Sequence, residues 1–295
     1  MGERIEYESC SPFEIHHILN QLDSTPKHPV FGELFLPTGE GPFACVVACH
    51  GSRGWSDHHM DHANHWLDAG IAVFRVHSFD SRQVESVVDN QMLATHAMML
   101  VDAFAALGVL NDDARIDRNK IGITGWSLGG TVALYAAWEP IISAFGNHRF
   151  AAHLPFYPAA HMRPVVQDWS NAPVLILHGD ADDWTPVHFV KSLMSQIPDV
   201  QLHEYAGCHH AFDSIEPKTW LPHAIHIDDK TVEIDADGMM SGELEPGVRM
   251  PLNEPAERFA AFQILQNIGA HACGDADARA DAMERASAFW VSHLA

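Results

Sequence analysis

Short apolar runs alternate with stretches of helical periodicity along this chain. The apolar runs are rich in β-branched residues and bounded by Gly or Pro, which is typical of buried strands. The stretches between them end at helix-breaking residues such as Gly108, Pro140 and Pro198. We predict strands at 31–37, 43–50, 71–76, 120–126, 150–158, 173–179 and 200–206, and helices at 58–69, 86–108, 128–138, 187–197 and 276–294.

Strands separated by helices predict a mostly parallel sheet covered on both faces, in one α/β domain that spans residues 1–295. Residues 214–255 are the exception to this alternation. They combine alternating polarity, an Asp-Gly turn and several prolines, so we predict a hairpin-like excursion before the C-terminal helix. This excursion could form a rim around a site or a subunit contact in a homodimer.

The net charge of the chain limits the kinds of partner that it can bind. A formal net charge of -22, from 39 acidic and 17 basic residues, repels nucleic acid and disfavours binding to a membrane through Lys and Arg. No run approaches the ~18 apolar residues of a membrane span, and the first residues lack a signal-peptide pattern. The five cysteines include no Cys-x-x-Cys pair, which suits reduced thiols. We therefore expect a cytoplasmic protein.

The segment "IGITGWSLGG", residues 121–130, places Ser127 between glycines where a predicted strand meets a predicted helix. Gly125 and Gly129 allow strand and helix to approach, and Gly130 gives extra clearance. The amides at the start of the helix favour negative charge that develops nearby. The glycines could instead make only a tight turn, but the strand before and the helix after favour a nucleophile elbow.

The acid and the base of a catalytic triad should follow such a serine in that order. The strand at 173–179 is followed by "DADDWTP", which offers Asp180, Asp182 and Asp183 as the acid. The strand at 200–206 is followed by "CHHAFD", which offers His209 and His210 as the base. The residues thus predict a serine nucleophile with a histidine base, and the spacing alone leaves the choice within each group open.

An oxyanion hole needs two backbone amides near the nucleophile. Leu128, directly after the serine, supplies one candidate, and Ser52 in the glycine-rich loop "CHGSRGW" supplies the other. Aromatic residues beside the motifs could wall an apolar pocket for the substrate, although simple packing is the alternative for each. These residues are Trp55, Trp126, Trp184 and Phe212.

Four motifs, "HGSRG", "GWSLGG", "HGDADDWTP" and "YAGCHHAFD", resemble the dienelactone hydrolase family of α/β-hydrolases in order and spacing, from about residue 30 to 213. The resemblance implies the α/β-hydrolase fold. It selects Asp182, which lies three residues after the glycine of "HG", and His210, which precedes a small residue and a phenylalanine. The dienelactone hydrolase that names the family has a cysteine nucleophile, whereas this chain has Ser127, so the family name does not settle the substrate.

Two arginines are candidates for binding a substrate carboxylate by a bidentate pair. Arg82 ends "VHSFDSR", which resembles the family segment after the fourth strand, and Arg53 lies in the oxyanion loop. A structural or surface role is the alternative for both.

The 22 histidines raise the question of a metal site. His58, His62 and His65 follow one another at i, i+4 and i+7 beside Asp61, so a helix would align three imidazoles. The run lacks a His-Glu-x-x-His pattern, and the serine machinery is complete without a metal. We therefore expect no metal ligands and no cofactor. Cys208 does not follow a strand at an elbow, so we do not expect a thiol nucleophile.

We expect a serine hydrolase that cleaves small to medium acyl or aryl carboxylic esters, with lactones as a further substrate class. The expected partner is a small-molecule ester. The same triad could cleave amide or C–C bonds, because the shape of the pocket decides which leaving group is accepted. A non-catalytic ligand-binding member of the fold is the remaining alternative.

Overall fold

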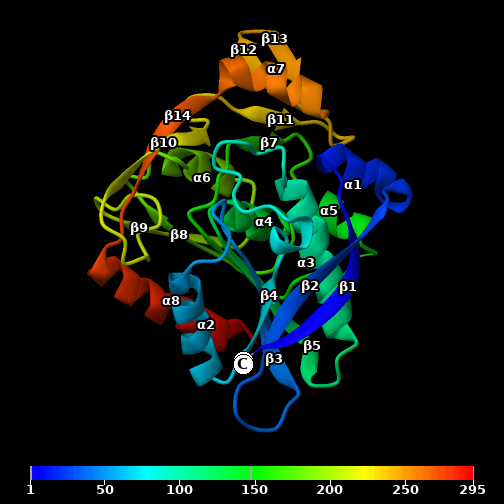
Figure 1. Cartoon of the computed structure of the whole chain (residues 1–295), viewed down its shortest axis with the longest axis vertical. Coiled ribbons are helices and arrows are strands. Elements are labelled where there is room, and N and C mark those ends of the chain that lie inside the picture. Colours follow the sequence, from blue (N-terminus) through cyan, green and yellow to red (C-terminus); the bar gives the residue numbers. More distant parts are fainter. Residues whose placement is uncertain (1, 147, 295) are drawn as a thin grey trace.

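A computed structural model of the chain describes residues 2–146 and 148–294. Its centre is an eight-stranded sheet (Figure 1). Two strands at one edge pair antiparallel, and the strands from β4 onward run parallel. The order across the sheet is β1 (Glu3–Cys10), β2 (Lys27–Phe35), β4 (Ala72–Val76), β3 (Phe43–Cys49), β5 (Ile116–Trp126), β6 (His153–Phe156), β8 (Val174–Gly179) and β9 (Val200–Tyr205). The predicted mostly parallel sheet is confirmed.

Helices cover both faces of this sheet. Helices α2 (Asp57–Asp68) and α8 (Ala276–Leu294) contact each other on one face, as Figure 1 shows. Helices α3 (His96–Asn111) and α4 (Leu128–Tyr135) pack on the other face. Strand β3 shows why both faces are apolar: Cys45 and Val47 join the core under α3 and α4, whereas Val46 joins the core under α2 and α8. Successive side chains on a strand point to opposite faces, so both cores need apolar residues.

The helix predicted at 86–108 is shorter in the structure, where α3 begins at His96 after the capping residue Thr95. The preceding residues form a loop instead. Its backbone is held by tertiary hydrogen bonds, from Val87 N to Ser52 O at 2.9 Å and from Ile225 N to Val88 O at 3.1 Å. These contacts, which no local pattern encodes, override the helical periodicity of the segment.

Several short elements were not predicted. Strand β1 and helix α1 (Ile15–Gln21) precede the first predicted strand. Pro140, read as a helix stop, lies at the first turn of α5 (Glu139–Ala144), where a proline is well tolerated. Helix α6 (Val187–Met194) agrees closely with its prediction.

Residues 219–272, here called the covering segment, lie outside the central sheet at one end of the molecule (Figure 1). The sequence placed an excursion at 214–255, and the structure continues it because its last strand returns to pair with its first. A small four-stranded sheet joins it to β7 (Met162–Pro164). The elements of the segment are β10 (Thr219–His226), β11 (Val232–Ile234), β12 (Met240–Glu245), β13 (Val248–Pro251), α7 (Pro255–Leu265) and β14 (Asn267–Ala272).

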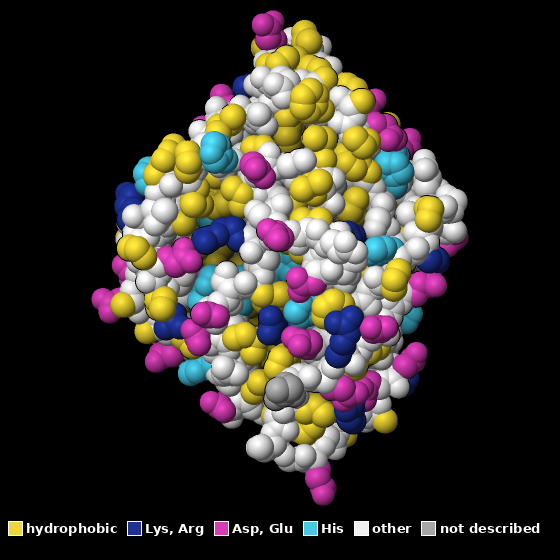
Figure 2. All heavy atoms as spheres, in the orientation of Figure 1, with side chains coloured by type: hydrophobic (Ala, Val, Ile, Leu, Met, Phe, Trp, Pro, Cys, Tyr) yellow, Lys and Arg dark blue, Asp and Glu magenta, His cyan; other side chains and the backbone are white. Residues whose placement is uncertain are grey.

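The surface of the covering segment differs from the rest of the visible face. Figure 2 shows hydrophobic atoms gathered at this end, whereas acidic side chains are scattered over the remainder. Exposed apolar side chains of the segment include Met239, Val248, Phe259 and Ile264. Within the part of the chain that the structure describes, no helix has the length and apolar character needed to cross a membrane.

Candidate active site

Ser127 lies at the turn between β5 and α4 with a left-handed backbone, at φ 55° and ψ -111°. A non-glycine residue at such a positive φ is strained. The turn is also crowded, because a Cβ at Gly125 would collide with the carbonyl of Gly129, and one at Gly129 with the carbonyl of Cys49. A bond from Ser127 N to Phe156 O, at 3.0 Å, fixes the turn. The glycines therefore allow a sharp bend that projects the serine hydroxyl clear of the backbone.

His210 connects Ser127 to Asp182 through two short contacts. Its Nε2 lies 2.8 Å from Ser127 Oγ, and its Nδ1 lies 2.7 Å from Asp182 Oδ2. The backbone of His210 is held by β14, since Cys273 N donates to His210 O at 2.9 Å. The structure thus brings together the three side chains expected to form a triad, in a buried hydrogen-bonded relay.

Asp182 is held as a carboxylate. Burial alone would raise its pKa, but attraction to His210 and the hydrogen bond between them outweigh burial and lower the pKa. The amides of Trp184 and Thr185 each donate to Asp182 Oδ1 at 2.9 Å, and the Thr185 hydroxyl donates to Oδ2 at 3.0 Å. The acid is therefore ionised and fixed in orientation, as an imidazole partner requires.

The neighbouring acid and base candidates point elsewhere. Asp183 accepts hydrogen bonds from the backbone and the ring of His271, at 2.8 and 2.7 Å. His209 Nε2 lies 2.8 Å from Lys218 Nζ. Burial raises the pKa of Cys208 to about 11, so this thiol stays protonated near neutral pH. Asp182 and His210 therefore point toward Ser127, whereas their neighbours Asp183 and His209 contact other residues.

The two candidate oxyanion amides, Ser52 and Leu128, make no other hydrogen bond among residues 2–146 and 148–294. The Gly51 carbonyl is held on the opposite side of its peptide by His50 Nδ1 at 2.9 Å and Gly54 N at 3.0 Å. Because a trans peptide points its N–H away from its carbonyl, these bonds also orient the Ser52 N–H. Burial lowers the pKa of His50 to about 4, which keeps this ring neutral.

A second buried carboxylate, Asp213, lies close to His210 through Tyr157. It accepts hydrogen bonds from Trp126 Nε1 at 2.9 Å, from the Tyr157 hydroxyl at 2.8 Å and from His62 Nε2 at 3.1 Å. Tyr157 in turn packs edge-on against His210, with ring centroids 4.7 Å apart. The sequence reading assigned no role to Asp213, although it ends the "CHHAFD" motif. A polar residue that follows the base so closely was the only available signal.

This network also explains the histidines of α2. His62 is buried against Asp213, and His58 Nε2 lies 3.8 Å from the same carboxylate. His65 is exposed to solvent. Two of the three imidazoles therefore face a protein carboxylate while the third faces away, and among the described residues they do not form a cluster with metal-ligand spacing.

Two cavities meet at Ser127, and Ser52 and Trp184 also line both. The larger, here called the apolar cavity, holds about 960 Å³ of empty space with its mouth included. Much of its wall comes from the covering segment. Its apolar lining includes Leu128, Ala159, Met162, Phe189, Ile225, Ile227, Val232, Met240, Leu252 and Phe262.

The smaller, here called the polar cavity, holds about 430 Å³ and opens on the other side of the serine. Its walls are mainly the loop after β3, the start of α2 and the loop that carries His210. Its polar lining includes Arg53, Ser56, His58, His59, Tyr157 and His210.

The predicted substrate-binding residues divide between these cavities and the core. Trp184 lines both cavities, whereas Trp126 and Arg53 line the polar one. Arg53 is half-exposed and pairs with Glu216 at 3.0 Å.

Three of the predicted residues line neither cavity. Arg82 holds the buried Asp102 through two bonds of 2.6 and 3.0 Å, so its guanidinium serves the structure. Phe212 is fully buried against Tyr205. Trp55 donates to Val76 O at 3.2 Å. The side chains of Arg82, Phe212 and Trp55 thus contact the protein itself, and their role in substrate binding stays a prediction.

The sequence matches a known family over most of its length. Residues 31–234 match the model described as the dienelactone hydrolase family. Among curated proteins, a probable 2-oxo-3-(5-oxofuran-2-ylidene)propanoate lactonase from a Bradyrhizobium species is 26% identical over 193 residues, which cover 61% of this chain and 77% of the relative.

Solved structures are similar in fold. A dienelactone hydrolase-like promiscuous phosphotriesterase from metagenomic libraries is 15% identical, with both chains fully covered and a TM-score of 0.58. A propionate-bound esterase from Thermogutta terrifontis is 15% identical over 66% of this chain and 84% of the other, with a TM-score of 0.50. At these identities the similarity shows a shared fold.

Proposed function

The chain belongs to the dienelactone hydrolase family and has its α/β-hydrolase fold, and on this premise we propose that it hydrolyses carboxylic esters through a covalent acyl-enzyme. The observation that carries the proposal is the relay in which His210 lies 2.8 Å from Ser127 Oγ and 2.7 Å from Asp182 Oδ2. In this proposal Ser127 is the nucleophile, His210 the general base and Asp182 the acid that orients it.

In the first half of the reaction, Ser127 Oγ attacks the carbonyl carbon of the ester while its proton passes to His210 Nε2. Asp182 accepts from His210 Nδ1 and stabilises the imidazolium that forms. The tetrahedral intermediate then expels the alcohol oxygen, which takes the proton from His210 Nε2. The alcohol leaves, and the acyl group stays bonded to Ser127.

The negative charge on the substrate oxygen is met by the amides of Ser52 and Leu128. Their lack of other partners among the described residues and the anchoring of the Gly51 carbonyl support this role. The start of α4 adds the positive end of a helix dipole at the same point. Loss of one oxyanion donor typically raises the barrier by about 2.7–4 kcal/mol.

In the second half, water takes the place of the alcohol. His210 removes a proton from the water as its oxygen attacks the acyl carbon. The second tetrahedral intermediate returns Ser127 Oγ as the leaving group, and His210 Nε2 protonates it. The carboxylic acid leaves, and the relay regains its starting protonation.

The two cavities support a placement for each half of the ester. An apolar acyl or aryl group fits the apolar cavity, whose wall of aliphatic and aromatic side chains gains by burying it. The alcohol and the attacking water fit the polar cavity, which reaches His210 directly. The curated relative from Bradyrhizobium is named as a probable lactonase, so lactones, which are cyclic esters, belong among the candidate substrates.

Amide and C–C bond cleavage by the same relay is the alternative, because these reactions differ from ester hydrolysis only in the leaving group. A non-catalytic role would leave the buried relay and the strained serine without a purpose. Esters are therefore the first choice, and activity on a panel of esters, lactones and anilides separates the three possibilities.

The test is a panel of p-nitrophenyl acyl esters of two to ten carbons, lactones and anilides, measured with the wild type and with Ser127→Ala. We expect the wild type to hydrolyse acyl esters and Ser127→Ala to lose at least about 10⁴-fold in kcat, because no other nucleophile replaces the hydroxyl. A fluorophosphonate probe should label only the wild type. Equal activity in both proteins, or preferred cleavage of anilides, would contradict the proposal.

A further inference from the structure

The apolar cavity is not lined by apolar side chains alone. Its wall includes His96, His161 and Arg258, which come from the start of α3, the loop after β6 and helix α7. These three residues are here called the Arg258 group. None of them belongs to the relay at Ser127, so the proposed reaction does not explain polar side chains beside an apolar part of the substrate.

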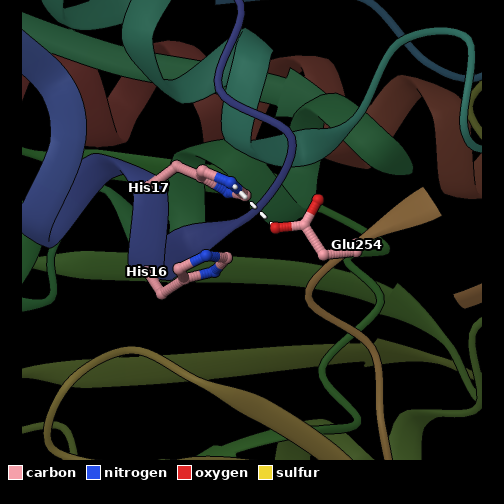
Figure 3. Close-up of side chains that lie close together, drawn as sticks. All are labelled: His16, His17 and Glu254. Carbon is pink, nitrogen blue, oxygen red and sulfur yellow. Dashed lines mark ion pairs between the residues drawn. The ribbon is translucent and has the colours of Figure 1, made fainter. Parts of the chain in front are cut away.

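Arg258 faces the cavity from a fixed position. It is only 4% exposed, and its guanidinium pairs with the fully buried Glu14 and lies 4.5 Å from the ring centroid of Phe13. One turn earlier in α7, the capping residue Glu254 also contacts α1. Figure 3 shows the ring of His17 extending toward its carboxylate, and His17 Nε2 lies 3.5 Å from Glu254 Oε1. These contacts join the starts of α1 and α7, which leaves the guanidinium little freedom.

Glu14 also sets the state of His96. His96 Nε2 lies 2.7 Å from Glu14 Oε1, on the carboxylate that Arg258 contacts through Oε2. Arg258 already balances this charge, and burial lowers the pKa of His96 to about 4, so the ring is neutral. The pair is not aligned as a hydrogen bond, but the carboxylate still favours a proton on Nε2. Nδ1 is then an acceptor, and no group in residues 2–146 and 148–294 donates to it.

His161 is neutral for a similar reason. Burial is the main cause that lowers its pKa, to about 3, and repulsion from the nearby His96 adds to the effect. The ring packs edge-on against Phe189, another residue of the cavity wall, with centroids 6.1 Å apart. A neutral imidazole has one donor and one acceptor. The Arg258 group therefore presents both donors and acceptors to the cavity, and Glu14 balances its single charge.

We propose that the Arg258 group binds a hydroxyl on the acyl part of the ester, so that the preferred substrates are esters of hydroxy acids. A hydroxyl donates one hydrogen bond and accepts others, which matches an acceptor at His96 Nδ1 beside donors from Arg258 and His161. This inference rests on the proposed function, because it places the acyl group in the apolar cavity.

Other acyl groups match the Arg258 group less well. A ketone or ether oxygen only accepts, so it leaves His96 Nδ1 without a donor. A carboxylate also only accepts, and it would lie near the charge of Glu14, which Arg258 already balances. A plain alkyl chain removes these polar groups from water without replacing their hydrogen bonds, which costs free energy. The hydroxyl is the group that avoids all three penalties.

The test is isothermal titration of Ser127→Ala, which keeps the cavity but lacks the proposed nucleophile. The ligands are methyl esters of unbranched acids of six, eight and ten carbons, each length with a terminal methyl, hydroxyl or carboxylate group. We expect the hydroxy ester of the best-fitting length to bind at least about tenfold more tightly than the unsubstituted ester. The carboxylate ester should bind no more tightly than the unsubstituted one.

Two further variants, His96→Phe and His161→Phe, are made in the same background. Each exchanges an imidazole for a ring without polar atoms and should reduce the preference for the hydroxyl at least about fivefold. Arg258 is kept, because its loss would leave the buried Glu14 unpaired. The matched control is His65→Phe, the same exchange at an exposed position that lines neither cavity, which should keep the full preference.

Equal binding of the hydroxy and unsubstituted esters at all three lengths would overturn the inference. So would tightest binding of a carboxylate ester, or a full preference in both His96→Phe and His161→Phe. Hydrolysis of the same esters by the wild type is measured separately. Because binding needs no turnover, a chain that prefers the hydroxy ester in calorimetry but hydrolyses none of the esters would contradict the proposed function alone.

Discussion

The apolar and polar cavities that meet at Ser127 are built from different parts of the chain. The apolar cavity depends on the covering segment, whereas the polar cavity is formed by the loops at the ends of the central strands. On the polar side, buried charges are matched by partners, as Asp182 and Asp213 show. On the apolar side, aliphatic and aromatic side chains form more than half of the lining, although Arg258, which pairs with the buried Glu14, also reaches this cavity.

This difference separates the chemistry of the site from its selectivity. A change on the polar side disturbs charges that develop during the reaction, which a low-dielectric site amplifies. A change on the apolar side alters contact with a group that does not react, which is worth only about 1–3 kcal/mol per methylene-sized change. We therefore expect polar-side variants to lower activity on all substrates, and apolar-side variants to alter the order of substrates.

The largest expected effect is that of Asp182→Asn. The amide keeps the shape of the side chain but stabilises the wrong imidazole tautomer of His210, so kcat should fall by about 10⁴-fold on every ester of the panel. Steady-state kinetics on short and long acyl esters checks this. Asp183→Asn is the matched control, since Asp183 faces His271, and should retain activity within a few-fold. A comparable loss in both variants would contradict the assigned acid.

The next effect is a loss of stability at low pH. It tests how strongly the polar side depends on His50 being neutral. His50 has its pKa lowered by burial to about 4, against 6.5 for an unperturbed imidazole. Because the folded value lies below the unfolded one, the unfolded chain takes up the proton first as the pH falls. The stability that depends on neutral His50 is complete above about pH 6.5 and is lost towards pH 4, by about 3 kcal/mol in total.

Urea unfolding between pH 7 and 4 measures this loss. His50→Asn retains a side-chain donor for Gly51 O but cannot titrate, so its free energy of unfolding should decline less steeply with falling pH than that of the wild type. His153→Asn, which removes a buried histidine with a similarly lowered pKa in the core, shows the effect of one titrating group away from the site. Parallel curves for the wild type and His50→Asn would refute the prediction.

A moderate effect is expected from Val232→Phe, which adds bulk to the wall of the apolar cavity. The ratio of kcat/KM for decanoyl over acetyl esters should fall by about 10–100-fold, while the acetyl ester reacts almost normally. Val248→Phe makes the same exchange at an exposed position of the covering segment and should leave the ratio unchanged. A uniform loss on both esters would show that the cavity does not hold the acyl group.

The smallest effect is expected from Arg53→Ala. Arg53 lines the polar cavity and is half-exposed, so its attraction for an anionic alcohol group is weakened by solvent. The KM of esters with a carboxylate on the alcohol side should rise by about 2–5-fold, and 0.5 M salt should abolish the difference. Arg4→Ala removes an exposed arginine elsewhere and should have no effect. A change with neutral esters would contradict a purely electrostatic role.

The sequence predicted the inner strands β3, β4, β6 and β8 because they are buried on both faces and show continuous apolar runs. The edge strand β1, which is partly exposed, was not predicted. It could not predict the loop before α3, where the bonds of Val87 and Val88 to distant residues override a helical pattern. Among the candidate acids and bases, chain spacing left several choices, and a family resemblance was needed to prefer Asp182 and His210. Their hydrogen bonds to each other come from three-dimensional placement, which spacing alone does not contain.

Pocket residues were harder to predict because adjacency to a motif says nothing about side-chain direction. Trp184 and Phe212 each lie within two residues of a proposed triad member, yet the first lines both cavities and the second is fully buried in the core.

The backbone of Ser127 has one more consequence. A serine at φ 55° and ψ -111° holds about 1–3 kcal/mol of strain that glycine would not feel. If Ser127 is the nucleophile, as proposed, a chain with Ser127→Gly would lose its activity and yet melt at a higher temperature. On the same proposal, selection for stability alone would replace this serine, and selection for activity would retain it.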